Sequence, residues 1–449
     1  MGYGYQVRYS DPQVLSRCGF SKVAHVPCIF DSSPKLHRAA SQFLIDRALG
    51  IWEPKSRGKE VSPIPPSFLS IKNYASRLCN FLDWCEAEGI NPLVADYNSE
   101  VISGYQKAMV VGRWSRDGRP LRESSINVRV DTVVDYLSWC ADKGFRDEFL
   151  VPKISKLYFD GRAEQRDWML GRTQGRIGKL HEVNKRLSFP DENEIIGWRV
   201  RVAQRVGKGE VEGLIADLIL ETAIRREEAA CWRNDTLPQD QTKWDVINPN
   251  DPDDKKIVLV ELRYGTKGKE YGRDHGDKIG PLGIIRVPYS LAIRLQHYSQ
   301  IERAFALAQA VRVGATIAQQ RKIRDQSVHL FLKPDTGKRY TGEDIYEFWR
   351  RAHPPHGWSP HAARDYWACC VLWERIEQYR RFLEEISGSD VQDEILAAFR
   401  MNVETVIRLE IQPQLRHASR ETTLVYLQWV TDRLGINLNL NKKWMNSFA

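Results

Sequence analysis

Two eleven-residue segments of the sequence, at 80–90 and 135–145, share a pattern that constrains the fold more than any other feature. NFLDWCEAEGI at 80–90 matches DYLSWCADKGF at 135–145 in a bulky pair, a Trp-Cys pair and a late Gly. Over 68–89, apolar residues recur every three or four positions, which is typical of an amphipathic helix that stops at its Gly. The match occurs only once, whereas a solenoid needs about three or more repeats. We therefore expect two similar helices packed in one small bundle.

Further along the chain the pattern changes from helices alone to helices mixed with strands. β-rich segments are predicted at 256–263 and 284–289, between helical segments that continue to the C-terminus. The 449 residues are enough for two or three domains. The sequence therefore predicts a multidomain chain, with an all-α domain followed by a mixed α+β domain that holds a small antiparallel sheet.

Composition shifts suggest where the domains meet. Pro63, Pro65 and Pro66 mark the end of an irregular N-terminal segment that contains a helical candidate at 36–49. The predicted parts are an N-terminal extension at 1–62, a helical domain at 63–150, a basic linker at 151–187 and a second domain at 188–449.

Positive charge is concentrated in and just after the helical domain. Lys and Arg number 66 against 58 Asp and Glu, a net charge of +8 that permits a polyanionic partner without requiring one. Such runs are most often solvated surfaces, and a surface that contacts DNA phosphates is the alternative. The candidate DNA-binding residues are Arg113, Arg116, Arg119, Arg122, Arg129, Lys153 and Lys156.

Several classes of protein lose support from what the sequence lacks. There is no Walker A loop, HExxH, GxSxG or strand-linked GxGxxG motif, and the eight Cys form no CxxC pair. Three His lie close together at 353, 356 and 361, but Pro354 and Pro355 make the approach irregular and no carboxylate or thiol ligand is suggested, so we expect no metal and no cofactor. The longest apolar stretch, at 214–220, is too short to span a membrane, and no export signal or lipid anchor is indicated. We expect a cytoplasmic protein with reduced thiols and no membrane partner.

The second domain contains four short boxes rich in chemically active side chains. In ETAIRREEAACWRNDTL, Arg225 stands at a predicted helix start, where an ordinary surface arginine is the alternative. RYGTKGKE places Lys267 and Lys269 in a turn after a strand, where lysines usually only interact with solvent.

The other two boxes contribute His, Arg and Tyr. In SPHAARDYWA, Ser359 can cap a helix that has Pro360 at its first position, so His361 and Arg364 share one face. Arg and His at a helix N-terminus suit a phosphate. In QLRHASRETTLVYLQWV, Tyr426 stands nine positions after His417 (426 − 417 = 9), although a Tyr in such a context is most often a core residue.

Taken together, the four boxes resemble the tyrosine recombinase, or phage-integrase, family. TAIRREE is similar to its T-G-L-R-x-x-E box, GTKGKE to its β-hairpin lysine, PHAARD to its H-x-L-R-H box and LRHASRETTLVY to its L-G-H-x-x-x-x-T-T-x-x-Y box. The resemblance covers roughly 188–430 as the catalytic domain, and 63–150 resembles the core-binding domain.

The sequence departs from the family pattern at five places. Ala223 and Arg416 replace usual glycines, and Asp365 replaces the usual His after the box arginine. A helical pair is inserted at about 374–405, and the hairpin stretch 268–283 is longer than expected.

The resemblance implies a DNA breaking and rejoining enzyme. Tyr426 would attack a phosphodiester to form a 3′-phosphotyrosyl link, and Arg225 and Arg364 would hold the non-bridging oxygens. Lys267, or else Lys269, would be the general acid, His361 the base or proton relay, and His417 a hydrogen-bond donor. The family also implies double-stranded DNA, four protomers, a Holliday junction and accessory DNA-bending or directionality proteins at the nucleoid. The tail after Tyr426 would pack on a neighbouring protomer or on its own chain.

Three other functions remain open at this stage. A type IB topoisomerase uses a similar residue set to relax DNA, and a protelomerase would make hairpin ends. A non-catalytic DNA-binding accessory protein is the alternative from a different class.

Overall fold

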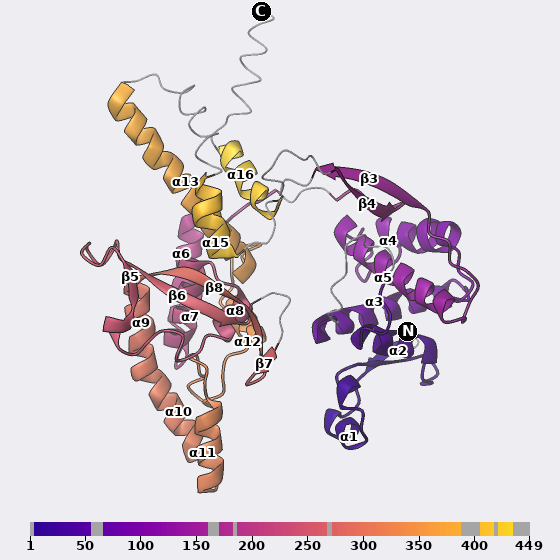
Figure 1. Cartoon of the computed structure of the whole chain (residues 1–449), viewed down its shortest axis with the longest axis horizontal. Helices are drawn as coiled ribbons and strands as arrows, with labels where there is room; N and C mark the ends of the chain where they lie inside the picture. The colour runs from indigo at the N-terminus through magenta and orange to yellow at the C-terminus, as the bar shows by residue number, and fades with distance from the viewer. Residues whose placement is uncertain are drawn as a thin grey trace, which may run out of the picture. The chain divides into compact units, whose positions relative to one another are not determined.

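The computed structural model describes residues 4–54, 66–159, 170–182, 186–266, 272–387, 405–416 and 421–433. The chain divides into two compact units, Met1–Val183 and Asn184–Ala449 (Figure 1). Among the described residues, no helix is long and apolar enough to cross a membrane.

The first unit is mainly helical, with two short pairs of antiparallel strands. Its elements are β1 (Gln6–Arg8), α1 (Pro12–Arg17), η1 (Ser21–Val23), β2 (Cys28–Phe30), α2 (Arg38–Ala48), α3 (Phe68–Ala87), the π-helix η2 (Tyr97–Gln106), α4 (Lys107–Val110), α5 (Glu123–Asp142), β3 (Lys153–Phe159) and β4 (Leu170–Arg176).

The matched segments form the ends of α3 and α5, which pack against each other. Ser67 caps α3 by accepting a hydrogen bond from the Ser70 N–H. Gly89, with φ of +68°, then takes the left-handed conformation that lets the chain turn away. Trp84 and Trp139, the matching tryptophans, are both buried in one core. The prediction of two similar helices in one bundle is confirmed.

The N-terminal segment shares this core. The helix predicted at 36–49 is α2, which packs on both α3 and α5. The Trp139 indole N–H donates to Asp46 Oδ2 over 3.0 Å. Residues before the Pro-rich boundary therefore help to stabilise the helical bundle.

The segment predicted as a basic linker contains the ribbon of β3 and β4, which the sequence patterns did not predict. After β4 the chain follows the bundle surface. Arg176 Nε lies 2.7 Å from Asp131 Oδ1, and the Leu180 N–H donates to Asn127 Oδ1 over 3.0 Å. Both contacts hold the second half of this segment to α5.

The second unit combines helices with one four-stranded sheet. Its elements are α6 (Glu192–Ala203), α7 (Gly209–Thr222), α8 (Arg226–Ala230), η3 (Gln241–Lys243), β5 (Asp245–Ile247), β6 (Ile257–Tyr264), β7 (Gly272–Asp274), β8 (Asp277–Pro288), α9 (Tyr289–Gln300), α10 (Glu302–Arg312), α11 (Ile317–Gln326), α12 (Gly342–Arg351), α13 (Pro360–Ser387), the π-helix η4 (Ile407–Ile411), α15 (Gln412–Leu415) and α16 (Glu421–Arg433).

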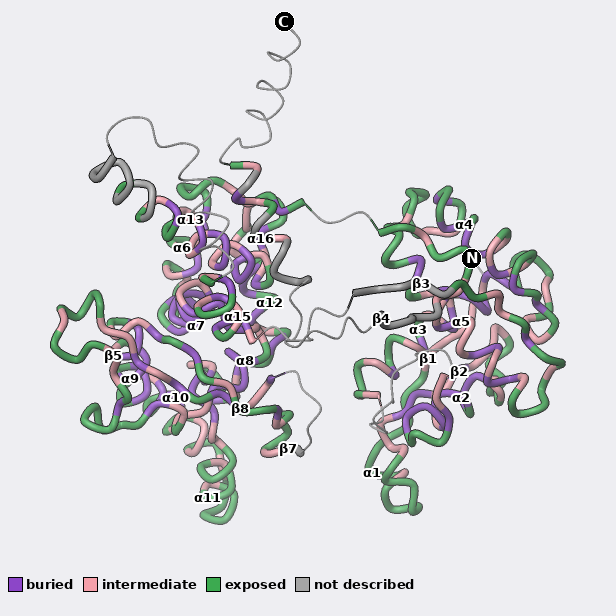
Figure 2. Tube along the Cα trace, turned by 45° about the horizontal axis from the view of Figure 1, so that its top comes forward, coloured by how far each residue is buried: buried purple, intermediate pink, exposed green. Residues whose placement is uncertain are grey.

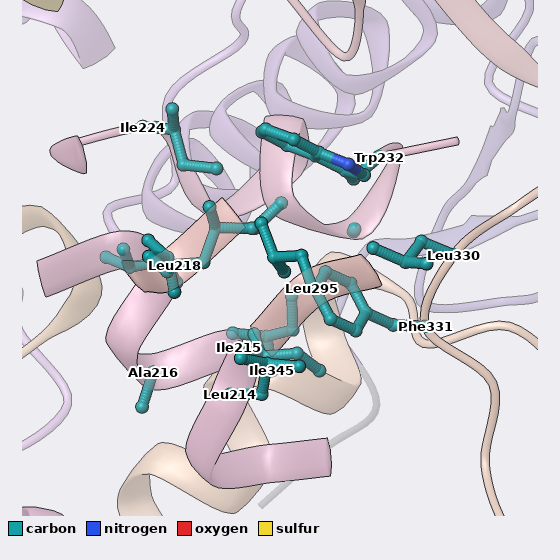
Figure 3. Close-up of a cluster of buried hydrophobic side chains, with 14 of the residues drawn as sticks. Leu214, Ile215, Ala216, Leu218, Ile224, Trp232, Leu295, Leu330, Phe331 and Ile345 are labelled. Carbon is teal, nitrogen blue, oxygen red and sulfur yellow. The ribbon is translucent and has the colours of Figure 1, made fainter. Parts of the chain in front are cut away.

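The sheet has the strand order β5-β6-β8-β7, and all of its pairs are antiparallel. It confirms the small antiparallel sheet predicted from the sequence, whose two β-rich segments lie in β6 and β8. The core is built around α7, most of whose trace is buried (Figure 2). Leu214 and Leu218 of α7 lie in one apolar cluster with Leu295 of α9 (Figure 3).

Two parts of the second unit extend away from its core (Figure 1). α10 and α11 project together, and α11 has no buried residue. α13 continues without a break to Ser387, so the described beginning of the segment predicted as a helical insertion is a continuation of this helix. The remainder of that segment, up to 404, lies outside the described residues.

Candidate active site

The first arginine of the site stands at the turn between α7 and α8. α7 is followed by Ala223, whose φ of +53° is left-handed, and Arg225, in an extended conformation, is the N-cap residue directly before α8. Arg225 Nη1 donates to Glu228 Oε1 over 2.8 Å, and its backbone N–H donates to Glu228 Oε2 over 2.7 Å. Arg225 Nη2 also lies 3.3 Å from the Leu415 carbonyl oxygen. The predicted helix start is confirmed.

The second arginine is buried in the first turn of α13. The Ser359 hydroxyl accepts from the Ala362 N–H over 3.2 Å, and Pro360 is the first helical residue, as predicted. Arg364 donates to the carbonyl oxygens of Ala223 and Leu415. Its guanidinium therefore joins the end of α7, the start of α13 and the end of α15. Burial, together with the nearby Arg225, lowers the pKa of Arg364 to about 10.

A buried glutamate compensates these charges, and sequence reasoning did not count it among the site residues. Glu228 is buried between Arg225 and Arg416 and forms an ion pair with each. Arg416 has a left-handed φ of +48° and brings a third guanidinium to the site. The signal in the sequence was the acidic residue three positions after Arg225, within one helical turn.

The segment before Arg416 is held in place by a glutamine. The Gln414 side chain accepts from the Arg286 backbone N–H over 2.8 Å and donates to the Thr222 carbonyl over 2.8 Å. These bonds tie α15 to β8 and to the end of α7. The position of the Leu415 carbonyl, which both Arg225 and Arg364 contact, follows from them.

Tyr426 lies on α16 and is only 2% exposed. Its ring packs in an apolar cluster with Ala368, Leu372 and Val430. The hydroxyl donates to Asp365 Oδ1 over 3.0 Å. Burial, and then the carboxylate of Asp365, raises the pKa of Tyr426 above its usual value. The tyrosine is thus a core residue whose only polar side-chain atom faces the site.

His361 is exposed at the start of α13, with 77% of its side chain accessible. Its Nε2 lies 4.0 Å from Asp365 Oδ2, whereas Tyr426 contacts the other oxygen of that carboxylate. The structure therefore brings Arg225, Arg364 and Tyr426 together, and it connects His361 to them through Asp365. Lys267, Lys269 and His417 lie outside the described residues.

The described residues do fix where the lysine loop begins. Gly265 has a φ of +71°, and a Cβ there would lie 2.5 Å from the Glu227 carbonyl oxygen. The following Thr266 is buried. The chain at the end of β6 therefore packs directly on α8, close to Glu228, and Lys267 follows two residues after Gly265.

The candidate DNA-binding residues differ in exposure. Arg113, Arg116, Arg119 and Arg122 lie between α4 and α5 and are mostly exposed, and Lys153 is exposed at the start of β3. Arg129 is half-buried, and its Nη1 donates to Asn80 Oδ1 over 2.8 Å, so it serves the packing of the bundle. The side chain of Lys156 lies outside the described residues.

In the part of the chain that the structure describes, no three His, Cys, Asp or Glu side chains are grouped so that they could hold a metal ion. The eight cysteines are free.

Comparison with solved structures finds similar chains. One is the XerH site-specific recombinase bound to palindromic difH substrate in a post-cleavage complex, with 13% identity, a TM-score of 0.46, and coverage of 84% of this chain and 81% of that chain. The Tn1549 transposon integrase in complex with transposon right end DNA has 12% identity, a TM-score of 0.43, and coverage of 88% and 99%. The XerA recombinase has 12% identity, a TM-score of 0.29, and coverage of 88% of this chain and 98% of that chain. All three similar structures are recombinases or integrases.

No family model matches the chain, and no curated protein matches it. The solved structures share few residues with this chain, so no residue role is transferred from them.

Proposed function

We propose that this chain is a tyrosine recombinase that cuts and rejoins double-stranded DNA through Tyr426. The proposal is supported by one observation above all. Two guanidinium groups and one phenol from distant parts of the sequence converge on the turn after α7, where Arg225 and Arg364 share the Leu415 carbonyl and Tyr426 binds the residue next to Arg364. Convergence of these residue types suits attack on a phosphodiester.

The chemistry follows from these side chains. The planar guanidinium groups of Arg225 and Arg364 bind the non-bridging phosphate oxygens and stabilise the charge of the transition state. Attack by the Tyr426 oxygen forms a 3′-phosphotyrosyl bond and releases a 5′ hydroxyl. A loop lysine, Lys267 or Lys269, protonates the leaving oxygen, and His417 donates a hydrogen bond to the phosphate.

The covalent link conserves the energy of the phosphodiester bond, so a second DNA end can attack it and restore the backbone. We infer that four protomers carry this out on paired sites, with a Holliday junction as intermediate. The exposed arginines between α4 and α5 contact the DNA backbone. Double-stranded DNA is the substrate, with accessory DNA-bending or directionality proteins as further partners.

Product analysis tests the proposal. Duplexes selected from a random-sequence pool by binding to the full chain are mixed in pairs with the protein. Recombinant duplexes and four-way junctions are expected. Relaxation of a supercoiled plasmid alone would indicate a type IB topoisomerase, and covalently closed hairpin ends would indicate a protelomerase. Binding without any cleavage would contradict the enzymatic assignment and leave an accessory DNA-binding role.

A further inference from the structure

The two oxygens of Asp365 face different groups. Oδ1 accepts the hydrogen bond of the buried Tyr426 hydroxyl over 3.0 Å. Oδ2 lies 4.0 Å from Nε2 of His361, whose side chain is 77% exposed. The Asp365 side chain itself is 12% exposed. The carboxylate therefore connects a phenol that water does not reach with an imidazole that water does reach.

A phenol in this setting needs a proton acceptor. Burial and the Asp365 charge both raise the pKa of Tyr426, so almost no phenolate forms at neutral pH before the attack. The proton has to leave as the bond to phosphorus forms, and it leaves to a group within hydrogen-bond distance. The Asp365 carboxylate lies at that distance and accepts a hydrogen bond from this hydroxyl.

We propose that Asp365 accepts the proton of Tyr426 during attack on DNA and passes it to His361 and water. This inference rests on the proposed function and deepens it. The Tyr426 Oη–P bond forms as the P–O5′ bond breaks, the phenol proton moves to Asp365, and the 5′ oxygen takes a proton from the loop lysine. His361 thus acts at the far end of the relay.

The charges around the carboxylate suit this role. On α13 it is flanked by Arg364, His361 and the Cys369 thiol, and α16 presents Tyr426. Arg225 and Arg416 act on Arg364 from the α7–α8 turn and the end of α15. Three guanidinium groups therefore gather at Arg364, the residue next to Asp365.

The alternative is that Asp365 only satisfies the hydroxyl of a buried tyrosine. Asp365→Asn separates the two roles, because the amide oxygen still accepts the hydrogen bond but cannot take a proton. Asp365→His replaces the carboxylate with an imidazole, which can also accept a proton. An imidazole titrates near pH 6.5, well above an ordinary aspartate side chain.

The experiment measures single-turnover formation of the covalent adduct by the full chain, from pH 4 to 9. The substrate is a nicked duplex selected from a random-sequence pool by binding. We expect Asp365→Asn to bind this DNA normally and to react about 10²- to 10⁴-fold more slowly, the range of general-base catalysis. Asp365→His should recover part of the rate, with its pH midpoint moved upward. His361→Gln should slow adduct formation less than Asp365→Asn does, because water can take the proton from Asp365 in place of His361.

Asp335→Asn is the matched control. Asp335 is half-exposed and forms an ion pair with Lys208, outside the site. The Asp335→Asn variant should therefore form the adduct at the wild-type rate and with the wild-type pH profile. An Asp365→Asn rate within about threefold of wild type would overturn the inference, as would an Asp365→His profile with no shift. If Asp365→Asn fails to fold by circular dichroism, the Asp365→His profile decides. Failure of the wild type to form any adduct would instead overturn the proposed function.

Discussion

Arg364 binds at the two places of the site where the backbone is left-handed. It binds the carbonyl groups of Ala223 and Leu415, and the residues at φ of +53° and +48° are Ala223 and Arg416. The recombinase boxes carry glycine at these two positions, and a left-handed residue other than glycine costs about 1–2 kcal/mol. This chain retains the conformations with Ala and Arg, and Arg416 regains stability through its ion pair with Glu228.

The buried Glu228 gives a prediction about stability and adduct formation. Glu228→Gln keeps the shape of the side chain but leaves Arg225 and Arg416 without their buried counter-charge. We expect the free energy of unfolding to fall by about 3–5 kcal/mol, as when one partner of a buried pair is removed. Adduct formation should slow as well, because the ion pair with Glu228 orients Arg225. Urea unfolding measures the first effect.

An exposed glutamate is the control for this substitution. Glu343 lies in the first turn of α12, and Glu343→Gln should change the free energy of unfolding by less than about 0.5 kcal/mol. Equal effects of the two substitutions would show that the buried glutamate does not compensate the arginines.

The raised pKa of Tyr426 predicts a dependence of stability on pH. Above about pH 10 the unfolded phenol ionises while the folded phenol keeps its proton. Unfolding then releases a proton, so the tyrosine's contribution to stability is present below pH 10 and is lost as the pH rises further. Urea unfolding at pH 8 to 11.5 should show the stability difference between wild type and Tyr426→Phe shrinking above pH 10. A difference that stays constant would contradict the buried position of the hydroxyl.

At the scale of the elements, the contact between the end of β6 and α8 depends on a glycine. Gly265 combines a φ of +71° with a backbone approach to α8 that leaves no room for a Cβ. Gly265→Ala should therefore destabilise the fold by at least the cost of the left-handed conformation, about 1–2 kcal/mol. It should also slow cleavage, since Lys267, a candidate general acid, follows two residues later. Thermal unfolding and single-turnover cleavage check both effects.

Gly276, in the β7–β8 turn, provides the matched control. Its φ is +87°, and the nearest atom to an added Cβ would be a side-chain nitrogen of Arg339 at 4.0 Å. Gly276→Ala should cost stability through its backbone conformation but leave cleavage nearly unchanged. If both substitutions slow cleavage equally, the packing of Gly265 on α8 does not position the loop.

The elements also show what a sequence can and cannot predict. The helices α3 and α5 followed from apolar periodicity and terminal glycines, and β6 and β8 from apolar β-rich runs, because these patterns are local. The pairs β1–β2 and β3–β4 were missed. Their strands are short or rich in charge and glycine, so no apolar β-rich run marks them in the sequence.

The same distinction applies to the site. Arg225, Arg364 and Tyr426 were chosen from their boxes, and the structure brings them together. The spacing of Glu228 from Arg225 was a signal in the sequence. The contacts of Asp365 with Tyr426 and of Arg416 with Glu228 join residues far apart in the chain, and spacing does not reveal them.

For the whole molecule, DNA affinity should depend on the arginines of the first unit. Arg116, Arg119 and Arg122 lie on the surface between α4 and α5. Replacing all three with Gln should weaken binding of duplex DNA and make its dependence on salt less steep. The slope of log affinity against log salt should fall by about 0.9 for each DNA phosphate that the variant no longer neutralises.

A charge-matched control lies in the second unit. Arg321, Lys322 and Arg324 lie on α11, which has no buried residue, and their triple Gln variant has the same net charge as the first. It should keep the wild-type salt slope, measured by fluorescence anisotropy. Equal slopes for the two triple variants would show that net charge, and not the α4–α5 surface, determines binding.

The central claim is that Tyr426 is the nucleophile, and mapping the covalent adduct tests it most directly. The wild type, incubated with a nicked duplex selected by binding, should accumulate a protein–DNA adduct that survives SDS. Tyr426→Phe should bind the same duplex and form none, because the missing hydroxyl contributes little to phosphate binding compared with the arginines. Mass spectrometry should locate the nucleotide on the peptide that contains Tyr426. A nucleotide on any other residue, or an adduct formed by Tyr426→Phe, would contradict the account.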